Sequence, residues 1–406
     1  MSSSEGRTRR EILADAAKVA AAASISGLAG CVSNVFPGVG GRWPDAAACT
    51  DPDAGTTGVF PAVTPTVVEV YNPDSVDLKY VIQESLVGDM LDKGLTALAQ
   101  RVTQFNASSA QDGGAEANAA GPAAADGGAD MAEAGQPNSD GGADSPWKVL
   151  LPNYRPGQRI GLKINCLNSQ VPTSPAITRA IIASLVNGLG VDPTTIVVWD
   201  RGYDELTKAG YTPDGLLGAQ LLGTKTSTLS GHTVNTPGEP EYGDPISPPV
   251  ECKSPRLSRI LTGLTDLTIN CPVLKAHGVS GVTGALKNIY GIIDIPGSYH
   301  TPILQTALPK LYALPAIRNS ISLTIIDALI STTTDNTDSP VDDRPRRILL
   351  AQDPVAIDSY AKDLLNQLRA AFNNPAIKQV DTSLTGWLAN AAAAGLGNTN
   401  YSLVQV

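Results

Sequence analysis

The sequence predicts an α/β domain in which helices flank a mostly parallel, Rossmann-like sheet. From residue 159 onward, short apolar segments rich in β-branched residues alternate with longer segments whose apolar residues recur at helical spacing. Strands that alternate with helices along the chain are typical of a parallel sheet that is covered on both faces. Roughly 300 residues lie in such patterned segments, which is enough to bury one large core. We therefore expect a single domain over residues 59–406.

The first expected elements are a strand at 66–71 and a helix at 85–104. They are followed by a segment, 106–145, that contains seven acidic residues, no Lys or Arg, and three copies of Asp-Gly-Gly-Ala. Such a composition lacks the apolar residues that would offset the entropy lost on ordering. We expect this segment to be a disordered acidic insertion that interrupts the domain without dividing it.

The remaining elements follow from hydrophobic period and from capping residues. Ser174-Pro175 and Asp353-Pro354 are each typical of an N-cap followed by proline at the first helical position. Strands are predicted at 159–166, 195–199, 266–271, 322–327, 347–351 and 401–406. Helices are predicted at 174–187, 281–292, 354–371 and 383–394. The segment 212–256 is rich in Pro, Gly and Thr, so no regular element is expected there.

The N-terminal 30 residues are typical of an export signal. Thr8-Arg9-Arg10-Glu11-Ile12-Leu13 matches the twin-arginine pattern, and Leu28-Ala29-Gly30-Cys31 matches a bacterial lipobox. The alanine-rich run between them is too short and too polar to span a membrane. We expect a signal peptide over 1–30, lipidation of Cys31, a tether over 31–58, and a protein anchored in the bacterial cell envelope, facing the periplasm or the cell surface. The alternative is a chance Arg-Arg pair before a frayed helix.

The overall composition excludes several classes of function. The formal net charge is −10 and no basic stripe is present, so nucleic acid is not an expected partner. Five cysteines in 406 residues do not make a disulfide scaffold. None of them has the Cys-x-x-Cys spacing of an iron–sulfur or zinc motif.

Residues that carry chemistry are concentrated between 271 and 300. Two of the three histidines, His277 and His300, occur here together with Lys275, Lys287 and Asn288. Glycines precede the helix predicted at 281–292, and a helix start favours an anion because its N–H groups are unpaired. We expect the two lysines to hold a carboxylate or phosphate and a histidine to move a proton. The alternatives are that the histidines ligate a metal or are structural.

Side chains of the same helix and of two strand ends are expected to join this site. Four-residue spacing places Thr283 on one helix face with Lys287. Alternation places Lys163 and Asn165 on one face of the strand at 159–166, near the carboxyl end where open α/β sheets bind ligands. Asp327 and Asp200 end other apolar strands and could reach the same edge. A solvated lysine on an edge strand is the alternative for Lys163.

The tripeptide Ile-Asn-Cys closes two predicted strands, at 164–166 and 269–271. If these strands are neighbours, their asparagines and cysteines lie side by side at one edge of the sheet. Cys166 and Cys271 could then form a disulfide, share a soft metal ion, or pack as small apolar residues, which is the commonest fate of buried cysteines.

These segments resemble domain-of-unknown-function family 362 over about residues 66–406. The residues that carry the resemblance are Lys163-Ile-Asn165, Thr173-Ser-Pro175, Asn270-Cys-Pro272, Lys275-Ala-His277-Gly278, Thr283-Gly-Ala-Leu-Lys287-Asn288, Gly291, His300, Asp327 and Asp353-Pro-Val-Ala-Ile-Asp358. The resemblance implies no particular reaction, because the activity of the family is not established. Some relatives carry a ferredoxin-like iron–sulfur module, but this chain lacks the cysteines for one.

Three functions are compatible with the sequence. The favoured one is an enzyme that binds a small anionic molecule and uses Lys and His in acid–base chemistry. The second is a metal or redox protein with an unknown cofactor, for which His277, His300, Cys166 and Cys271 are the candidate ligands; twin-arginine export of folded proteins motivates it. The third is a surface lipoprotein that binds a ligand without transforming it.

Overall fold

The computed structural model describes residues 64–112, 145–225, 240–334 and 337–406. The predicted signal peptide, Cys31 and the tether lie outside the described residues, as does most of the predicted acidic insertion. No helix in the described ranges is both long enough and apolar enough to cross a membrane.

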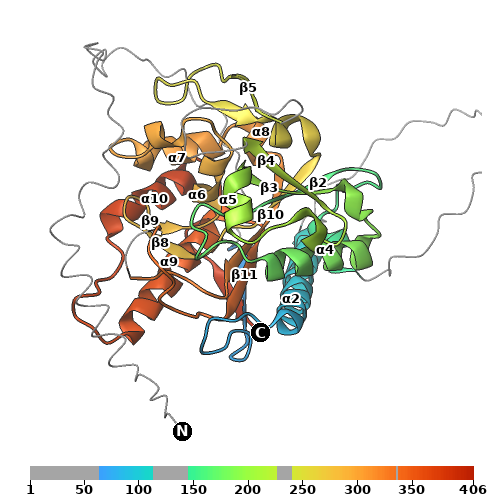
Figure 1. The fold of residues 1–406 in the computed structure, drawn as a ribbon, viewed down its shortest axis with the longest axis horizontal. Helices are drawn as coiled ribbons and strands as arrows, with labels where there is room; N and C mark the ends of the chain where they lie inside the picture. Colours follow the sequence, from blue (N-terminus) through green and yellow to red (C-terminus); the bar gives the residue numbers. More distant parts are fainter. Residues whose placement is uncertain (1–63, 113–144, 226–239, 335–336) are drawn as a thin grey trace, which may run out of the picture. The chain divides into compact units, whose positions relative to one another are not determined.

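An eight-stranded sheet forms the centre of the fold, in the order β12-β1-β11-β10-β7-β2-β3-β4 (Figure 1). Every strand is parallel to its neighbours except β11, which is antiparallel to both β1 and β10. The strands are β1 (Thr66–Tyr71), β2 (Ile160–Lys163), β3 (Ile196–Gly202), β4 (Gln220–Lys225), β7 (Leu267–Asn270), β10 (Ile321–Ala328), β11 (Arg347–Ala351) and β12 (Ser402–Gln405). The predicted α/β class with a mostly parallel sheet is confirmed.

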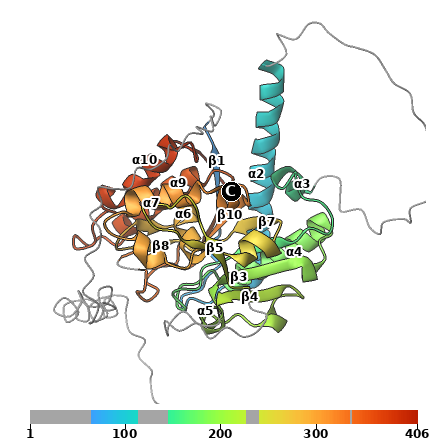
Figure 2. The ribbon, with the colours of Figure 1, turned by 90° about the horizontal axis from the view of Figure 1, so that it is seen from above.

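Helices cover both faces of this sheet (Figure 2). One apolar core contains Leu91, Ile181 and Leu206, and the other contains Leu308, Ile357 and Trp387. The first face is covered by α2 (Glu84–Asp112), α3 (Pro146–Leu150), α4 (Pro175–Leu189) and α5 (Tyr203–Lys208). The second face is covered by α6 (Ala285–Asn288), α7 (Leu304–Tyr312), α8 (Pro315–Arg318), α9 (Pro354–Ala371) and α10 (Gly386–Ala393).

Both predicted helix caps are confirmed. The hydroxyl of Ser174 accepts a hydrogen bond from the backbone N–H of Ile177 at 3.3 Å, at the start of α4. The carboxylate of Asp353 accepts from the backbone N–H groups of Val355 and Ala356, each at 2.8 Å, at the start of α9. The start of each of these helices can be predicted from sequence, because the capping residue and the proline act only on backbone groups of the first helical turn.

Three predicted boundaries are wrong. Helix α2 continues to Asp112, so residues 106–112 are helical although the sequence places them in the insertion. The last turns of α2 extend beyond the helices beside it (Figure 2), and the sequence there has no apolar period that distinguishes a helix from a loop. The irregular segment 212–256 contains the edge strand β4 and also β5 (Tyr242–Pro245), which pairs with β6 (Arg256–Ser258). The third error concerns 281–292, where the site is built.

Candidate functional site

The segment predicted as the start of a helix is instead the second strand of a hairpin. Strands β8 (Lys275–His277) and β9 (Gly281–Thr283) pair in antiparallel register, with Lys275 opposite Thr283. Gly281 has a φ of +74°, a left-handed conformation that suits glycine and stops a helix. The helix begins only afterwards, as the four-residue α6, which carries Lys287 and Asn288.

The N-terminus of α6 is not free for a ligand, because Asp358 of helix α9 occupies it. Its carboxylate accepts hydrogen bonds from the backbone N–H of Ala285 at 2.5 Å and of Leu286 at 2.9 Å. Position 284 has to be glycine, since a Cβ there would overlap this carboxylate. The expectation that an anionic ligand binds at a glycine-rich helix start is therefore wrong. The protein supplies that anion itself, and burial raises the pKa of Asp358 to about 7 against the lowering effect of the two N–H donors.

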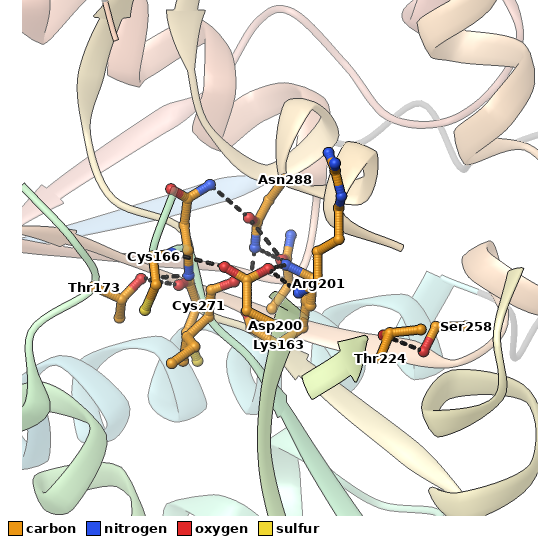
Figure 3. A network of polar contacts seen from close by, with 12 residues as sticks. Lys163, Cys166, Thr173, Asp200, Arg201, Thr224, Ser258, Cys271 and Asn288 are labelled. Atoms are coloured by element: carbon orange, nitrogen blue, oxygen red, sulfur yellow. Dashed lines mark hydrogen bonds and ion pairs between the residues drawn. The ribbon is translucent and has the colours of Figure 1, made fainter. Parts of the chain in front are cut away.

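A buried ion pair between Lys163 and Asp200 lies at the carboxyl edge of the sheet (Figure 3). Lys163 is 1% exposed, and its Nζ donates to Asp200 Oδ1 and to the carbonyl oxygen of Ile164, both at 2.7 Å. A Cβ at Gly291 would come within 2.6 Å of this Nζ, so a glycine is needed where the backbone passes the pair. The ion pair explains why a lysine is tolerated inside a sheet covered on both faces.

Asparagine side chains link this pair to the hairpin. The Nδ2 of Asn288 donates to Asn270 Oδ1 at 2.8 Å, and its Oδ1 accepts from Asn165 Nδ2 at 3.0 Å. The Nζ of Lys275 in turn donates to Asn165 Oδ1 at 3.0 Å. The network thus joins β2, β7, β8 and α6, and it holds α6 against the edge of the sheet.

The two Ile-Asn-Cys segments lie at the ends of neighbouring strands, as expected, but one follows β2 whereas Ile269 and Asn270 still belong to β7. Lys163, not Asn165, lies opposite Asn270, so the two copies are offset by two residues. Asn165 and Asn270 therefore meet through Asn288. Cys166 and Cys271 are free thiols in the apolar core on the α2–α4 side of the sheet.

A cavity of about 550 Å³ opens beside this network. It is lined by Asn165, Thr283, Lys287, Tyr290, Gly291 and both histidines of the segment, together with Asp200, Arg201, Glu205 and Asp294. Two of the lining residues, Thr283 and Arg201, each have a buried polar atom, Oγ1 and Nε respectively, that has no hydrogen-bond partner among the described residues. Figure 3 shows the Arg201 side chain extending away from Asp200.

Lys287 lies beside the two histidines of the cavity. Its side chain is 7% exposed, and its Nζ lies 3.3 Å from His300 Nε2 and 3.6 Å from the centroid of the Tyr290 ring. Among the described residues, neither Lys287 nor Lys275 forms an ion pair with a carboxylate. Burial, reinforced by the charge of Lys275, lowers the pKa of Lys287 to about 7. Burial also lowers the pKa of Lys275, which is 0% exposed, to about 8.

Both histidines of the site are neutral at neutral pH. Burial and the nearby charge of Lys287 lower the pKa of His277 to about 2 and that of His300 to about 4. The Nδ1 of His277 accepts from the backbone N–H of Val279 at 3.0 Å and of Ser280 at 3.2 Å, which assigns its proton to Nε2. The two rings stack with their centroids 5.7 Å apart. Lys287, Thr283, Asn165, His277 and His300 line this one cavity, whereas Lys163, Lys275 and Asn288, which the sequence assigns to the same site, do not line it.

Other candidate residues lie elsewhere. Asp327 does not line the cavity: its carboxylate accepts from the backbone N–H of Ser174 at 2.8 Å and of Leu329 at 2.9 Å, and so fixes the start of α4. Neither Cys166 nor Cys271 lines the cavity that His277 and His300 line. Within the described ranges, no three His, Cys, Asp or Glu side chains are grouped so that they could hold a metal ion.

Sequence reasoning missed three contributors to the site. Arg201 follows Asp200 at the end of β3, the neighbour of β2, so its place at the carboxyl edge was available from strand order alone. Asp358 was indicated only by the family resemblance, and its position within a helix, 73 residues from its partner Ala285, gave no local signal of its role. The β8–β9 hairpin was not predicted, because the spacing of the glycines in this segment also fits the start of a helix.

No curated protein matches the sequence. A crystal structure of a Thermotoga maritima protein aligns with 55% of this chain at 10% identity and a TM-score of 0.35, a likeness too low to support a comparison; the alignment spans about half of that chain, 56%. A family model described as a domain of unknown function matches residues 160–363, half of the chain, and contains the whole network from Lys163 to Asp358. The chain therefore belongs to the DUF362 family.

Proposed function

We propose that the cavity binds a small anionic molecule, a carboxylate or a phosphate, and that the protein is an enzyme that moves a proton on this molecule. The observation that carries the proposal is the buried Lys287, which lines the cavity beside neutral histidines, within reach of the charge of Lys275, and has no carboxylate partner among the described residues. An unpaired buried cation costs several kcal/mol unless an anion compensates it or it loses its proton. A bound carboxylate or phosphate would provide this compensation.

The unpaired polar atoms at the cavity support the same ligand class. Thr283 and Arg201 line the cavity, and the buried atoms Thr283 Oγ1 and Arg201 Nε have no hydrogen-bond partner within the described ranges. Arg Nε–H is a donor only, and a threonine hydroxyl can donate. Donors without acceptors favour an oxygen-rich anion, to which hydrogen bonds are shorter and stronger than between neutral groups.

Lys287 and His300 form the acid–base pair of the proposal. A general acid or base works best when its pKa is close to the operating pH, and the lowered pKa of Lys287, about 7, meets this condition. The Nε2 of His300, 3.3 Å from Lys287 Nζ, can exchange one proton with it. Burial, the larger effect, lowers the pKa of His300, and its backbone hydrogen bonds to Pro296 and Gly297 raise it, so the neutral ring is the form that can accept a proton from Lys287.

Ligand binding and proton exchange test this proposal. Phosphate, acetate and pyruvate are titrated calorimetrically, and exchange of the methyl protons of pyruvate with deuterium is followed by NMR. Lys287→Met is expected to weaken binding roughly 100-fold, because a charge-assisted hydrogen bond in a buried site contributes about 3 kcal/mol. His300→Gln should retain most binding and lose exchange.

The matched control is Lys93→Met, which removes an exposed lysine of α2 on the opposite face of the sheet and should change neither readout. Undiminished binding by Lys287→Met contradicts the proposed site. Tight binding without any exchange favours the non-catalytic binding protein instead.

Export and lipid anchoring are part of the proposal and rest on Arg9-Arg10 and on Leu28-Ala29-Gly30-Cys31. In a bacterial host, Cys31→Ser is expected to abolish labelling by radioactive palmitate and to release the protein from the membrane fraction. A single buried acyl chain binds only marginally, so anchoring requires several chains on that cysteine. Replacing Arg9 and Arg10 by Lys should keep the protein in the cytoplasm. Full membrane retention of the Cys31→Ser protein would exclude the lipobox.

A further inference from the structure

We infer that Lys287 is a nucleophile and that the anion bound in the cavity carries an aldehyde or ketone, with whose carbonyl carbon Lys287 Nζ forms an imine. The inference rests on the proposed function, and it narrows the ligand from small anions in general to anionic carbonyl compounds. The inference is based on the surroundings of the Lys287 amine. Lys287 lines the cavity, and its Nζ lies close to His300 Nε2, a proton acceptor, and to the ring of Tyr290. No carboxylate is found among its described neighbours.

Three lysines lie at the site, and only one has the access that imine formation needs. Lys163 Nζ is engaged in the ion pair with Asp200, with an N–O distance of 2.7 Å, and does not line the cavity. Lys275 is 0% exposed, does not line the cavity and donates to Asn165. Lys287 lines the cavity and forms no ion pair with a carboxylate in the described part of the chain.

Two effects are known to activate a lysine as a nucleophile, and both act on Lys287. Such lysines are either desolvated in an apolar pocket or placed next to another cation, so that the neutral amine is populated near neutral pH. Here burial is the larger effect and the charge of Lys275 is the second, and both act on the same amine. The ring of Tyr290 below Lys287 is fixed because its hydroxyl donates to the carbonyl oxygen of Tyr299 at 2.6 Å.

The step balances without an oxidant or a reductant. The Lys287 ammonium gives a proton to His300 Nε2, and the amine lone pair forms a bond to the carbonyl carbon while the C=O π pair becomes the oxygen lone pair. That oxygen takes the proton back from His300 and becomes a hydroxyl. The hydroxyl then leaves as water with the second proton of the nitrogen, and a C=N bond forms. The sum is R–NH₃⁺ and a carbonyl giving R–NH⁺=C and one water.

The unpaired donors fit the two ends of such a ligand. Thr283 shares the cavity with Lys287 and can donate from Oγ1 to the carbonyl oxygen as negative charge develops there. Arg201 is the lining cation that remains for the carboxylate or phosphate group, after Lys287 has become the nucleophile. A ligand with a carbonyl group and an anionic group would therefore use two donors, Thr283 Oγ1 and Arg201 Nε, that have no partner in the part of the chain that the structure describes.

Borohydride trapping tests the imine. The full-length protein is incubated separately with pyruvate, glyoxylate and pyridoxal 5′-phosphate, and then reduced with sodium borohydride, which converts an imine to a stable secondary amine. Peptide mass mapping locates the adduct. We expect adduct at Lys287 at least about tenfold above that at an exposed lysine such as Lys93, because burial and the charge of Lys275 increase the neutral fraction of the Lys287 amine. Lys287→Arg keeps a cation but cannot form an imine, so it should bind the same anions and give no adduct above background.

The outcomes separate the imine from the proposed function. An adduct at Lys287 in the wild-type protein that acetate suppresses supports the inference, and this result does not depend on how any variant folds. Saturable binding of the same compounds without adduct at Lys287 overturns the imine and leaves the anion site standing. Labelling of Lys287 no stronger than that of exposed lysines overturns the imine as well. If none of the compounds binds, both the proposed anion site and the imine are contradicted.

Discussion

Replacing Asp358 by alanine is expected to lower the free energy of unfolding by about 3–5 kcal/mol, because the backbone N–H groups of Ala285 and Leu286 lose their buried acceptor. Each buried donor left without a partner costs about 1–3 kcal/mol, and the deleted side chain also leaves a small void. The loss should reach beyond stability, since these N–H groups anchor the helix that carries Lys287. Equilibrium unfolding in urea measures the first effect, and anion titration measures the second.

Two controls define this effect. Asp358→Asn retains one acceptor oxygen, so it should cost about half as much as the alanine variant. Asp192→Ala removes a carboxylate that accepts from the backbone N–H of Thr194 at 2.9 Å on an exposed turn, where water can take its place, and should cost about 1 kcal/mol or less. A cost for Asp358→Ala no larger than that for Asp192→Ala would show that the carboxylate does not hold the start of α6.

Stability is expected to rise as the pH increases from about 7 to about 9.5, because Lys275 and Lys287 have lowered pKa values in the folded protein. In this window the unfolded chain, whose lysines titrate near 10.4, binds more protons than the folded chain, so each increase in pH favours folding. The destabilisation by each buried ammonium is greatest below its folded pKa and is relieved as the pH rises through that value. A shift of this size corresponds to roughly 3–5 kcal/mol per lysine.

The matching substitution is Lys287→Met, which removes a buried charge while retaining most of the volume. At pH 7 it should stabilise the protein by about 1–3 kcal/mol and flatten the rise of stability with pH, while weakening anion binding. Urea unfolding at several pH values, with and without phosphate, checks both statements. A bound anion raises the pKa of Lys287 and should also flatten the slope. A wild-type slope equal to that of Lys287→Met would contradict the buried-ammonium account.

The sequence predicted most accurately the features that depend on residues close together in the chain. The cap at Asp353 and the proline after it defined the start of α9, and an apolar segment at 66–71 defined β1 with both boundaries correct. The density of lysine, histidine and asparagine between 271 and 300 pointed to one site, and the structure places Lys287, His277 and His300 around one cavity. Strand alternation placed Lys163 at the carboxyl edge, where its ion pair is found.

The sequence by itself determined the class of fold, the caps, and the segment in which polar side chains gather, because capping and hydrophobic period act over a few residues. Only the tertiary structure decided how these parts combine: the reversed direction of β11, the two-residue offset between β2 and β7, and the carboxylate of Asp358 at the start of α6. These features depend on which distant segments pack together, and that depends on how well the surfaces of whole helices and strands fit one another. A carboxylate 73 residues away therefore took the position that local sequence assigned to a ligand.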